Sequence, residues 1–314
     1  MRLPGSVPAT LGTPISSSRR QSRIGRRQVL AEGFKVPEAP RWHDHRLWFV
    51  DIHSNSVMNT DLAGNVDVVA TFDDHTSGLG FLPGGDCLVV LRKSRLVMQI
   101  GADGATRVYA DLTPLGGDNL NDMIVDHQGR AYVDLIYDAR AYEPTGSVPV
   151  EEIGADCIVL IDPDGSFKVA AQALGGPNGL AISGDGKTLL VGETRAHRLR
   201  QFTVDQTTGA LSDPAVFAEL RDVRPDGICL DSEGAVWTAS PFTGYVHRIL
   251  EGGECTDSIS VGGKMPTAVI LAGSERRTLF MMIGDTTPEK VGLGQFGIGS
   301  IEFVEVGVAG DGLP

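Results

Sequence analysis

The stretch Asn178-Gly-Leu-Ala-Ile-Ser-Gly-Asp-Gly-Lys-Thr-Leu-Leu-Val-Gly192 carries the pattern that decides the fold of this chain. A polar residue and a small one open a short apolar run, and a turn of Ser, Gly and Asp leads to a second apolar run. These turn residues tolerate the backbone angles of a tight hairpin. The stretch therefore predicts two antiparallel strands joined by a short turn.

This pattern recurs six times after residue 28. Successive openings lie 39, 44, 57, 48 and 41 residues apart, which suits a four-stranded blade of about 40–50 residues for each copy. Most copies continue with a third strand and a short alternating fourth strand, as at 68–72 and 216–220. The chain is therefore predicted to be an all-β, six-bladed β-propeller. The six openings begin at Glu38, Ser77, Asn121, Asn178, Asp226 and Thr267.

The two ends of the chain indicate how the ring closes. The sixth copy stops after its third strand, at 299–306, and a segment that resembles its missing fourth strand lies at 29–34. Pairing these two segments leaves no open sheet edge between the ends. The displaced strand argues against the alternative, a β-sandwich whose turns are spaced by chance. We predict a single propeller domain over residues 29–314, after a disordered Arg- and Ser-rich extension over residues 1–28.

The net charge of the chain limits the classes of molecule that it is expected to bind. The sequence has 27 Lys and Arg against 40 Asp and Glu, for a net charge of −13, although residues 1–28 hold six arginines and no acid. So acidic a body repels nucleic acid and anionic membranes at long range. No apolar run approaches the roughly 18 residues of a membrane helix. We expect a small-molecule substrate, no nucleic acid and no membrane as partners, and the oligomeric state stays open.

The cysteines and the N-terminal extension bear on localisation. The four cysteines are widely spaced and form no C-x-x-C pair, which is typical of reduced thiols in a cytoplasmic protein. The extension lacks the apolar stretch of a secretory signal, but its composition leaves a targeting segment open beside simple disorder. We expect a cytoplasmic protein. The cysteines are Cys87, Cys157, Cys229 and Cys255.

The openings of the repeat predict a polar ring. The first strand of each blade lines the channel of a propeller, so the six opening residues meet at one end of the axis. Every one has a side-chain oxygen, and Glu38 and Asp226 are carboxylates. Burying two like charges together costs several kcal/mol unless a proton or cation compensates, and a divalent ion prefers such oxygen ligands. The alternative is that these residues only cap turns or hold channel water.

Five motifs in this order and spacing resemble one known family, that of senescence marker protein (regucalcin), gluconolactonase and luciferin-regenerating enzyme. The resemblance extends over about 280 residues, from residue 31 to the end. It implies a six-bladed propeller with one divalent ion, and many members hydrolyse sugar lactones. The motifs are Glu38-x-Pro-x-Trp42, Asn121-Asp-Met with Gly129-Arg-Ala-Tyr132, Gly176-Pro-Asn-Gly179, Pro225-Asp-Gly227 and Arg277-Thr-Leu-Phe280.

The resemblance also implies roles for individual residues. The family's metal ligands match Glu38, Asn178 and Asp226, and Asp226 matches the proposed proton acceptor. Asn121 matches a substrate-contacting asparagine, and a further substrate-binding carboxylate falls near Asp138. The chain departs from vertebrate members at Asn119, where they carry an arginine. The loss of this cation weakens the case for gluconolactone itself as the substrate. Asn119 and Asn121 are expected to orient the substrate.

These inferences predict a divalent-metal-dependent lactone hydrolase. The ion, Ca²⁺ first and Zn²⁺, Mn²⁺ or Mg²⁺ as alternatives, would polarise the carbonyl and activate a water, whose proton Asp226 would accept. The insertion at 139–153 is predicted to form part of the pocket wall or a lid. The alternatives are a propeller that acts on a non-lactone substrate (an organophosphate hydrolase, a lyase or an isomerase) and a non-catalytic calcium-binding protein.

Overall fold

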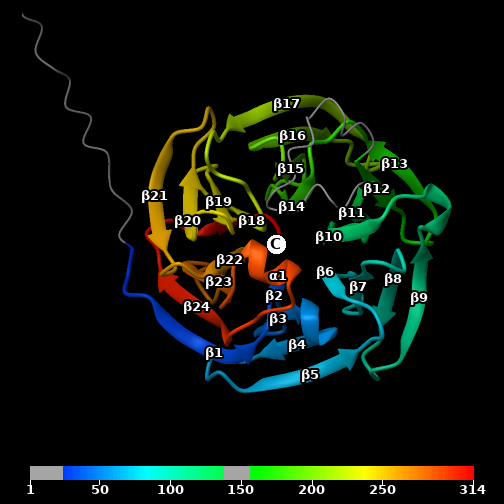
Figure 1. Cartoon of the computed structure of the whole chain (residues 1–314). Helices are drawn as coiled ribbons and strands as arrows, with labels where there is room; N and C mark the ends of the chain where they lie inside the picture. The colour runs from blue at the N-terminus through cyan, green and yellow to red at the C-terminus, as the bar shows by residue number, and fades with distance from the viewer. Residues whose placement is uncertain (1–23, 138–155) are drawn as a thin grey trace, which may run out of the picture.

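The structure is a computed structural model that describes residues 24–137 and 156–314. Almost all of its regular structure is β, in six antiparallel sheets arranged around a central axis (Figure 1). The predicted six-bladed propeller is confirmed. The predicted extension at 1–28 and the insertion at 139–153 lie largely outside the described residues.

Each blade follows the chain from its innermost strand to its outermost strand. Blade one contains β2 (Pro37–His43), β3 (Arg46–Asp51), β4 (Ser56–Thr60) and β5 (Val66–Thr71). Blade two contains β6 (Thr76–Phe81), β7 (Cys87–Leu91), β8 (Leu96–Ile100) and β9 (Thr106–Asp111). Blade three contains β10 (Asn119–Val125), β11 (Ala131–Ile136), β12 (Cys157–Ile161) and β13 (Phe167–Ala171).

The second half of the ring repeats this plan. Blade four contains β14 (Pro177–Ile182), β15 (Thr188–Glu193), β16 (Arg198–Val204) and β17 (Leu211–Glu219). Blade five contains β18 (Ile228–Asp231), β19 (Val236–Ser240), β20 (Tyr245–Ile249) and β21 (Cys255–Ser260). Blade six contains β22 (Met265–Ala272), β23 (Thr278–Gly284), β24 (Gly299–Glu305) and, at its outer edge, β1 (Gln28–Phe34).

The pairing of β1 with β24 closes the ring, as predicted. The two strands run antiparallel, with Ala31 opposite Ile301 and Phe34 opposite Gly299. Phe34 is buried, and its ring lies edge-on to Phe49 of blade one with centroids 4.9 Å apart. The N-terminal strand therefore joins the last blade to the first through packing as well as backbone hydrogen bonds.

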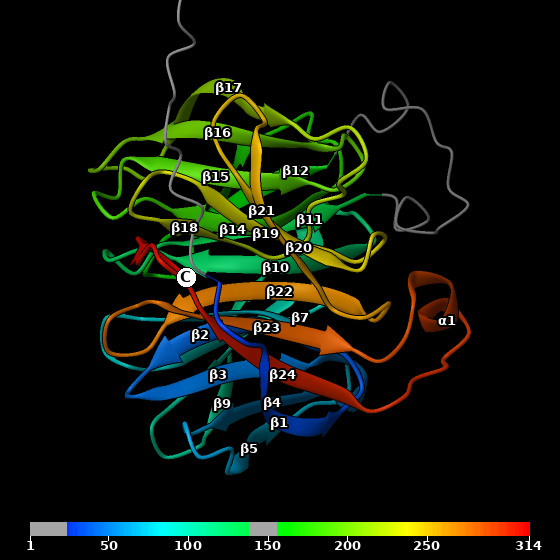
Figure 2. The same cartoon turned by 90° about the vertical axis from the view of Figure 1, so that its left-hand side faces the viewer.

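The last residues of the sequence form a feature that the repeat does not predict. The short strand β25 (Gly310–Asp311) pairs with β18 at the inner edge of blade five, and Leu313 bridges to Ile182 of blade four. Figure 2 shows this tail at the opposite end of the axis from helix α1 (Pro288–Gly292). The tail therefore links two inner strands at the end of the channel away from α1.

The apolar core lies between neighbouring blades. Every residue of β11 and β12 is buried, and Val133 of β11 belongs to one cluster with Leu88 and Val90 of β7. Sheets packed face to face at interior density fix the inner strands firmly. Side chains at the ends of those strands consequently occupy defined positions.

Two further sequence expectations concern cysteines and membranes. All four cysteines are free; Cys87, Cys157 and Cys229 are buried and Cys255 is exposed. The described helices, which are α1 and the single turns η1 (Ile52–Ser54) and η2 (Thr113–Leu115), are all too short to cross a membrane.

Candidate active site

The six residues that open the repeat all line one pocket, at the α1 end of the axis. Its volume is about 200 Å³, below the roughly 300–1,000 Å³ of pockets for drug-sized ligands. Four of the six are almost completely buried, and Glu38 and Asp226 are half-buried. The pocket therefore suits a compact polar molecule. The six residues are Glu38, Ser77, Asn121, Asn178, Asp226 and Thr267.

A β-bulge turns the inner strand at most of these positions. The pairing of the first two strands skips between Glu38 and Arg41 in blade one, and comparable shifts occur in blades two, three, four and six. A bulge bends the strand and redirects a side chain. In blade five, Asp226 lies just before β18, where its N–H donates to Ala239 O at 2.9 Å. The polar side chains thus leave the regular alternation of the sheet.

A small residue follows the opening residue in most copies, and close packing between neighbouring inner strands explains why it is small. A Cβ at Gly179 would lie 2.4 Å from the carbonyl oxygen of Asp226, and one at Gly227 would lie 2.4 Å from the Cβ of Ala268. Only glycine allows the inner strands of adjacent blades to approach so closely. The Gly at this position therefore brings Asn178 and Asp226 together. In blade three the same position holds Asp122, which adds a carboxylate to the pocket wall.

Three carboxylates share the floor of the pocket. Burial and the neighbouring Asp122 raise the pKa of Glu38 to about 8. Burial, Glu38 and Asp122 raise the pKa of Asp226 well above its ordinary value, against the opposing effects of Arg92 and of a hydrogen bond from Asn178. Burial also raises the pKa of Asp122. Like charges this close oppose ionisation of one another, so the floor favours a proton or a bound cation.

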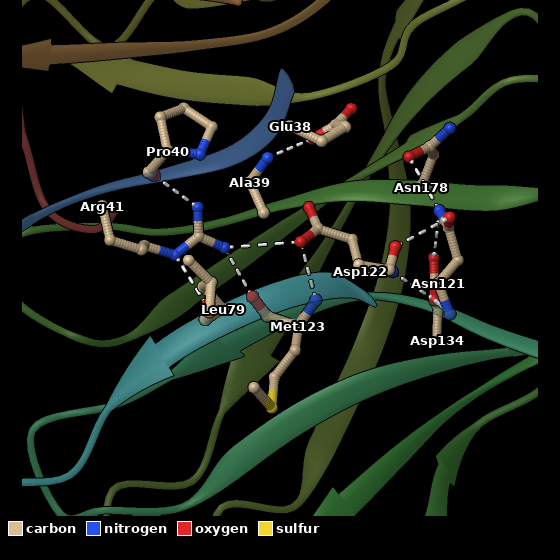
Figure 3. A network of polar contacts seen from close by, with 11 residues as sticks. Glu38, Ala39, Pro40, Arg41, Leu79, Asn121, Asp122, Met123, Asp134 and Asn178 are labelled. Carbon is tan, nitrogen blue, oxygen red and sulfur yellow. Dashed lines mark hydrogen bonds and ion pairs between the residues drawn. The ribbon is translucent and has the colours of Figure 1, made fainter. Parts of the chain in front are cut away.

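One buried cation, the guanidinium of Arg41, pairs with one of these three carboxylates. Figure 3 shows the Arg41 guanidinium donating to the carbonyl oxygens of Leu79 and Met123 and pairing with Asp122 Oδ1 at 3.4 Å. A buried arginine held by several acceptors keeps its geometry. The Arg41 charge offsets one of the three carboxylates and leaves two uncompensated within the floor.

A chain of amide hydrogen bonds orients the asparagines (Figure 3). Asn121 Nδ2 donates to Asn178 Oδ1 at 3.0 Å, and Asp134 accepts from the Asn121 backbone N–H at 2.9 Å. Asn178 Nδ2 in turn donates to Thr194 Oγ1 at 3.2 Å, and Thr194 donates to Pro225 O at 2.6 Å. These bonds fix the orientation of both amides within the pocket wall.

Residues that follow the second strands of blades one, two, four, five and six also line the pocket, and sequence reasoning missed them. Each second strand returns to the pocket end, so the residue after it reaches the rim. Arg92 follows β7, Thr194 follows β15, and Phe242 follows β19. The direction of the second strands was the signal that could have identified them. The remaining lining from these connections is Ile52, His53, Pro241, Pro288 and Val291.

Of the predicted substrate residues, Asn119 does not line this pocket and Asp138 is not described by the structure. Asn119 begins β10 and pairs with Ile136, and it is not among the described residues that line the pocket. Asp138 and the insertion at 139–153 lie outside the described residues. A cation does line the pocket from the neighbouring blade: Arg92 follows β7, and its carbonyl oxygen accepts a hydrogen bond from the backbone N–H of Leu120 at 3.1 Å.

The residues present fit a divalent cation of the oxygen-preferring kind. Glu38 and Asp226 supply two carboxylates that disfavour each other's charge, and Asn178 supplies an oriented amide oxygen. Ca²⁺ and Mg²⁺ bind such oxygens. Among residues 24–137 and 156–314 no group of three His, Cys, Asp or Glu side chains is arranged to hold a metal. A site here therefore depends on the amide of Asn178.

The fold and the pocket define the class of protein: a six-bladed β-propeller with an acidic, amide-lined pocket on its axis. Residues 36–284 match the model of one family, described as the SMP-30/Gluconolactonase/LRE-like region. Because that match covers most of the chain, the chain belongs to this family, as its motifs predicted.

Curated relatives agree with this membership, and a solved structure agrees with the fold. The chain is 25% identical over 258 residues to a pentonolactonase of Haloferax volcanii, with coverage of 81% of this chain and 83% of the relative. It is 24% identical over 257 residues to a 6-deoxy-6-sulfogluconolactonase of Pseudomonas putida, with coverage of 81% and 84%. The fold matches a luciferin-regenerating enzyme with a TM-score of 0.74, 18% identity and coverage of 90% and 96%.

Proposed function

We propose that this protein is a metal-dependent lactonase that opens a small, sugar-type lactone. The observation that carries the proposal is the convergence of Glu38, Asn178 and Asp226 in a single compact pocket. Two named relatives, a pentonolactonase and a sulfogluconolactonase, are lactonases by their names and support the reaction class. A regucalcin from Agrobacterium tumefaciens, described as calcium-binding, has the same fold with a TM-score of 0.73, 21% identity and coverage of 92% and 95%.

Glu38, Asn178 and Asp226 are the residues that would hold the cation, with Ca²⁺ the first candidate. A divalent cation supplies, when bound, polarisation of an ester carbonyl and a lowered pKa for water beside it. The raised pKa values of Glu38 and Asp226 support this assignment, because a cation would offset both the burial and the neighbouring carboxylate charges that raise them.

Asp226 is the proton acceptor in this proposal. Its carboxylate takes the proton from the water that attacks the lactone carbonyl, and the proton then passes to the ring oxygen as the C–O bond breaks. A general base must lie within reach of the proton that it takes, and Asp226 lines the pocket together with the other two proposed cation ligands. The product is the open-chain hydroxy acid, so atoms and charge balance.

Asn121 and Ser77 are the positioning residues. Ser77 Oγ donates to Asn121 Oδ1 at 3.4 Å, and Asn121 Nδ2 donates to Asn178. Since these bonds fix the Asn121 amide, its oxygen can accept from a substrate hydroxyl in one orientation only. Preorganised hydrogen bonds of this kind fix the substrate near its reacting geometry. Asn119 and Asp138 stay predicted substrate contacts.

Metal dependence tests the proposal. The full chain, stripped with a chelator, would be assayed for hydrolysis of aldonolactones with Ca²⁺, Mn²⁺, Mg²⁺ or Zn²⁺ restored in turn. We expect negligible turnover in the stripped protein and recovery with at least one ion. Equal hydrolysis by stripped and restored protein would show that the reaction does not need the metal. Binding of an ion without any lactone turnover would contradict the proposed lactonase activity.

A further inference from the structure

The pocket contains one cation that the proposed reaction does not use. Arg92 follows β7 and lines the pocket from blade two. Its backbone is held on both sides, since its N–H donates to His75 O at 2.9 Å and its carbonyl accepts from Leu120 N at 3.1 Å. The base of this side chain is therefore fixed beside the inner strands of blades two and three.

The partly buried Arg92 guanidinium makes no ion pair in the part of the chain that the structure describes. Two fully buried arginines, by contrast, pair with carboxylates: Arg130 with Asp126 at 2.6 Å, and Arg248 with Asp231 at 2.7 Å. For Arg92, no hydrogen bond or ion pair of the side chain occurs within residues 24–137 and 156–314. Among those residues it is also the only Lys or Arg that lines the pocket.

The charges of the pocket residues indicate what Arg92 could bind. Glu38, Asp122 and Asp226 contribute three negative charges when ionised, and Arg41 offsets one of them. Arg92 acts on Glu38 and Asp226 and lowers the pKa of both. A divalent cation on the proposed ligands would offset these two carboxylates and leave the guanidinium of Arg92 available to a further anion. The neighbouring His53 adds no charge at neutral pH, because burial, His75 and Arg92 lower its pKa to about 4.

We propose that Arg92 binds an anionic group of the substrate, so that the preferred substrate is a lactone that bears a carboxylate or sulfonate away from the reacting ester. The inference rests on the lactonase function proposed above and names its substrate class. A guanidinium presents two parallel N–H donors that match such a group. The pocket lining also includes the apolar residues Phe242, Pro288 and Val291, whose side chains offer an anion no hydrogen-bond donor.

The acidic body of the protein does not oppose this assignment. Its net charge acts at long range and is screened over about 8 Å at physiological salt. Within the pocket, the nearest unmatched charge decides the preference, and a charge-assisted hydrogen bond in a partly buried site is stronger than one in water.

A matched pair of lactones tests the proposal. D-glucono-1,4-lactone and D-glucaro-1,4-lactone differ only at C6, which is a hydroxymethyl group in the first and a carboxylate in the second. We would measure kcat/KM for both with the Ca²⁺-loaded wild type, Arg92→Gln and Arg92→Lys. Lys93→Gln is the control, because Lys93 is exposed, adjacent and outside the pocket lining.

We expect the wild type and Lys93→Gln to prefer the anionic lactone by about 10-fold or more. Arg92→Gln should lower this ratio by about 10- to 100-fold, mainly through KM for the anionic lactone, as expected when a charged hydrogen-bond donor is removed. Arg92→Lys should restore part of the ratio, because it keeps the charge but not the paired donors. No anionic preference in the wild type, or an equal loss on both lactones in Arg92→Gln, would overturn the proposal.

Calorimetric binding of the same two compounds separates this inference from the lactonase function. If neither compound is hydrolysed but the anionic one binds more tightly, and Arg92→Gln abolishes that difference, the lactonase proposal fails and the anion site stands. If both are hydrolysed with equal kcat/KM and bound with equal affinity, the lactonase stands and the anion site fails.

Discussion

The side-chain amide of Asn121 donates to the amide oxygen of Asn178 across 3.0 Å, and this bond joins the inner strands of blades three and four at the pocket. The amide nitrogen of Asn178 in turn donates to the hydroxyl oxygen of Thr194. The two asparagines come from corresponding positions of a repeat, 57 residues apart. The ring of blades thus converts a sequence period into one hydrogen-bonded network.

Thr194 should matter to cation binding although it is no ligand in our proposal. Thr194→Val keeps the shape of the side chain but removes the acceptor that orients Asn178. Loss of an outer partner of a metal ligand typically lowers affinity by about 10- to 100-fold. We expect a loss in this range for Ca²⁺, measured by titration calorimetry. Unchanged affinity would mean that Asn178 is oriented without Thr194.

Gly179 should tolerate no side chain. In Gly179→Ala the new Cβ would meet the backbone of Asp226 at 2.4 Å and of Ile228 at 2.6 Å, and backbone cannot yield as a side-chain tip can. We expect a loss of at least about 2 kcal/mol in the free energy of unfolding. Gly84→Ala is the control, because nothing lies within 4 Å of its added Cβ; its effect should stay within about 0.5 kcal/mol. Equal effects in urea denaturation would refute the packing explanation.

Stability of the cation-free protein should fall as the pH rises. The folded state keeps a proton on Glu38 up to a pKa of about 8, whereas the unfolded chain releases it near 4.5. Between these values the folded state binds more protons, so the free energy of unfolding decreases with increasing pH. Melting temperatures of chelated protein from pH 5 to pH 8 should show this decline, and Glu38→Gln should flatten it. A rise in stability over this window would contradict the assigned pKa.

Closure of the ring should depend on Phe34. Phe34→Ala removes a buried ring that packs on Phe49, and truncation of such a residue costs about 3–5 kcal/mol. Val29 lies on the same strand but is 55% exposed, so Val29→Ala should change the free energy of unfolding by no more than about 0.5 kcal/mol. Denaturation curves of the two variants would decide whether the N-terminal strand is held by packing or by backbone pairing alone.

The repeat made the fold predictable because each blade is a local unit with the same turn and strand pattern. The closing strand could be predicted for the same reason, since one copy lacks the piece that the N-terminus supplies. The ring of opening residues followed from the register of the repeat. Asp122 did not, because the other copies have Gly or Ala at its position, and Arg92 did not, because the positions after the second strands share no residue type. Helix α1 and the strand β25 occur once each, so no period indicates them.

The most direct test of our account compares Asp226→Asn with Asp222→Asn at saturating Ca²⁺. Asp222 is exposed and lies outside the pocket lining, so its variant controls for the loss of one acid. We predict that Asp226→Asn lowers kcat for a lactone by about 10²- to 10⁴-fold, the usual contribution of a proton acceptor, while Asp222→Asn retains wild-type turnover. Wild-type kcat in Asp226→Asn would contradict the central claim that this carboxylate takes the proton of the attacking water.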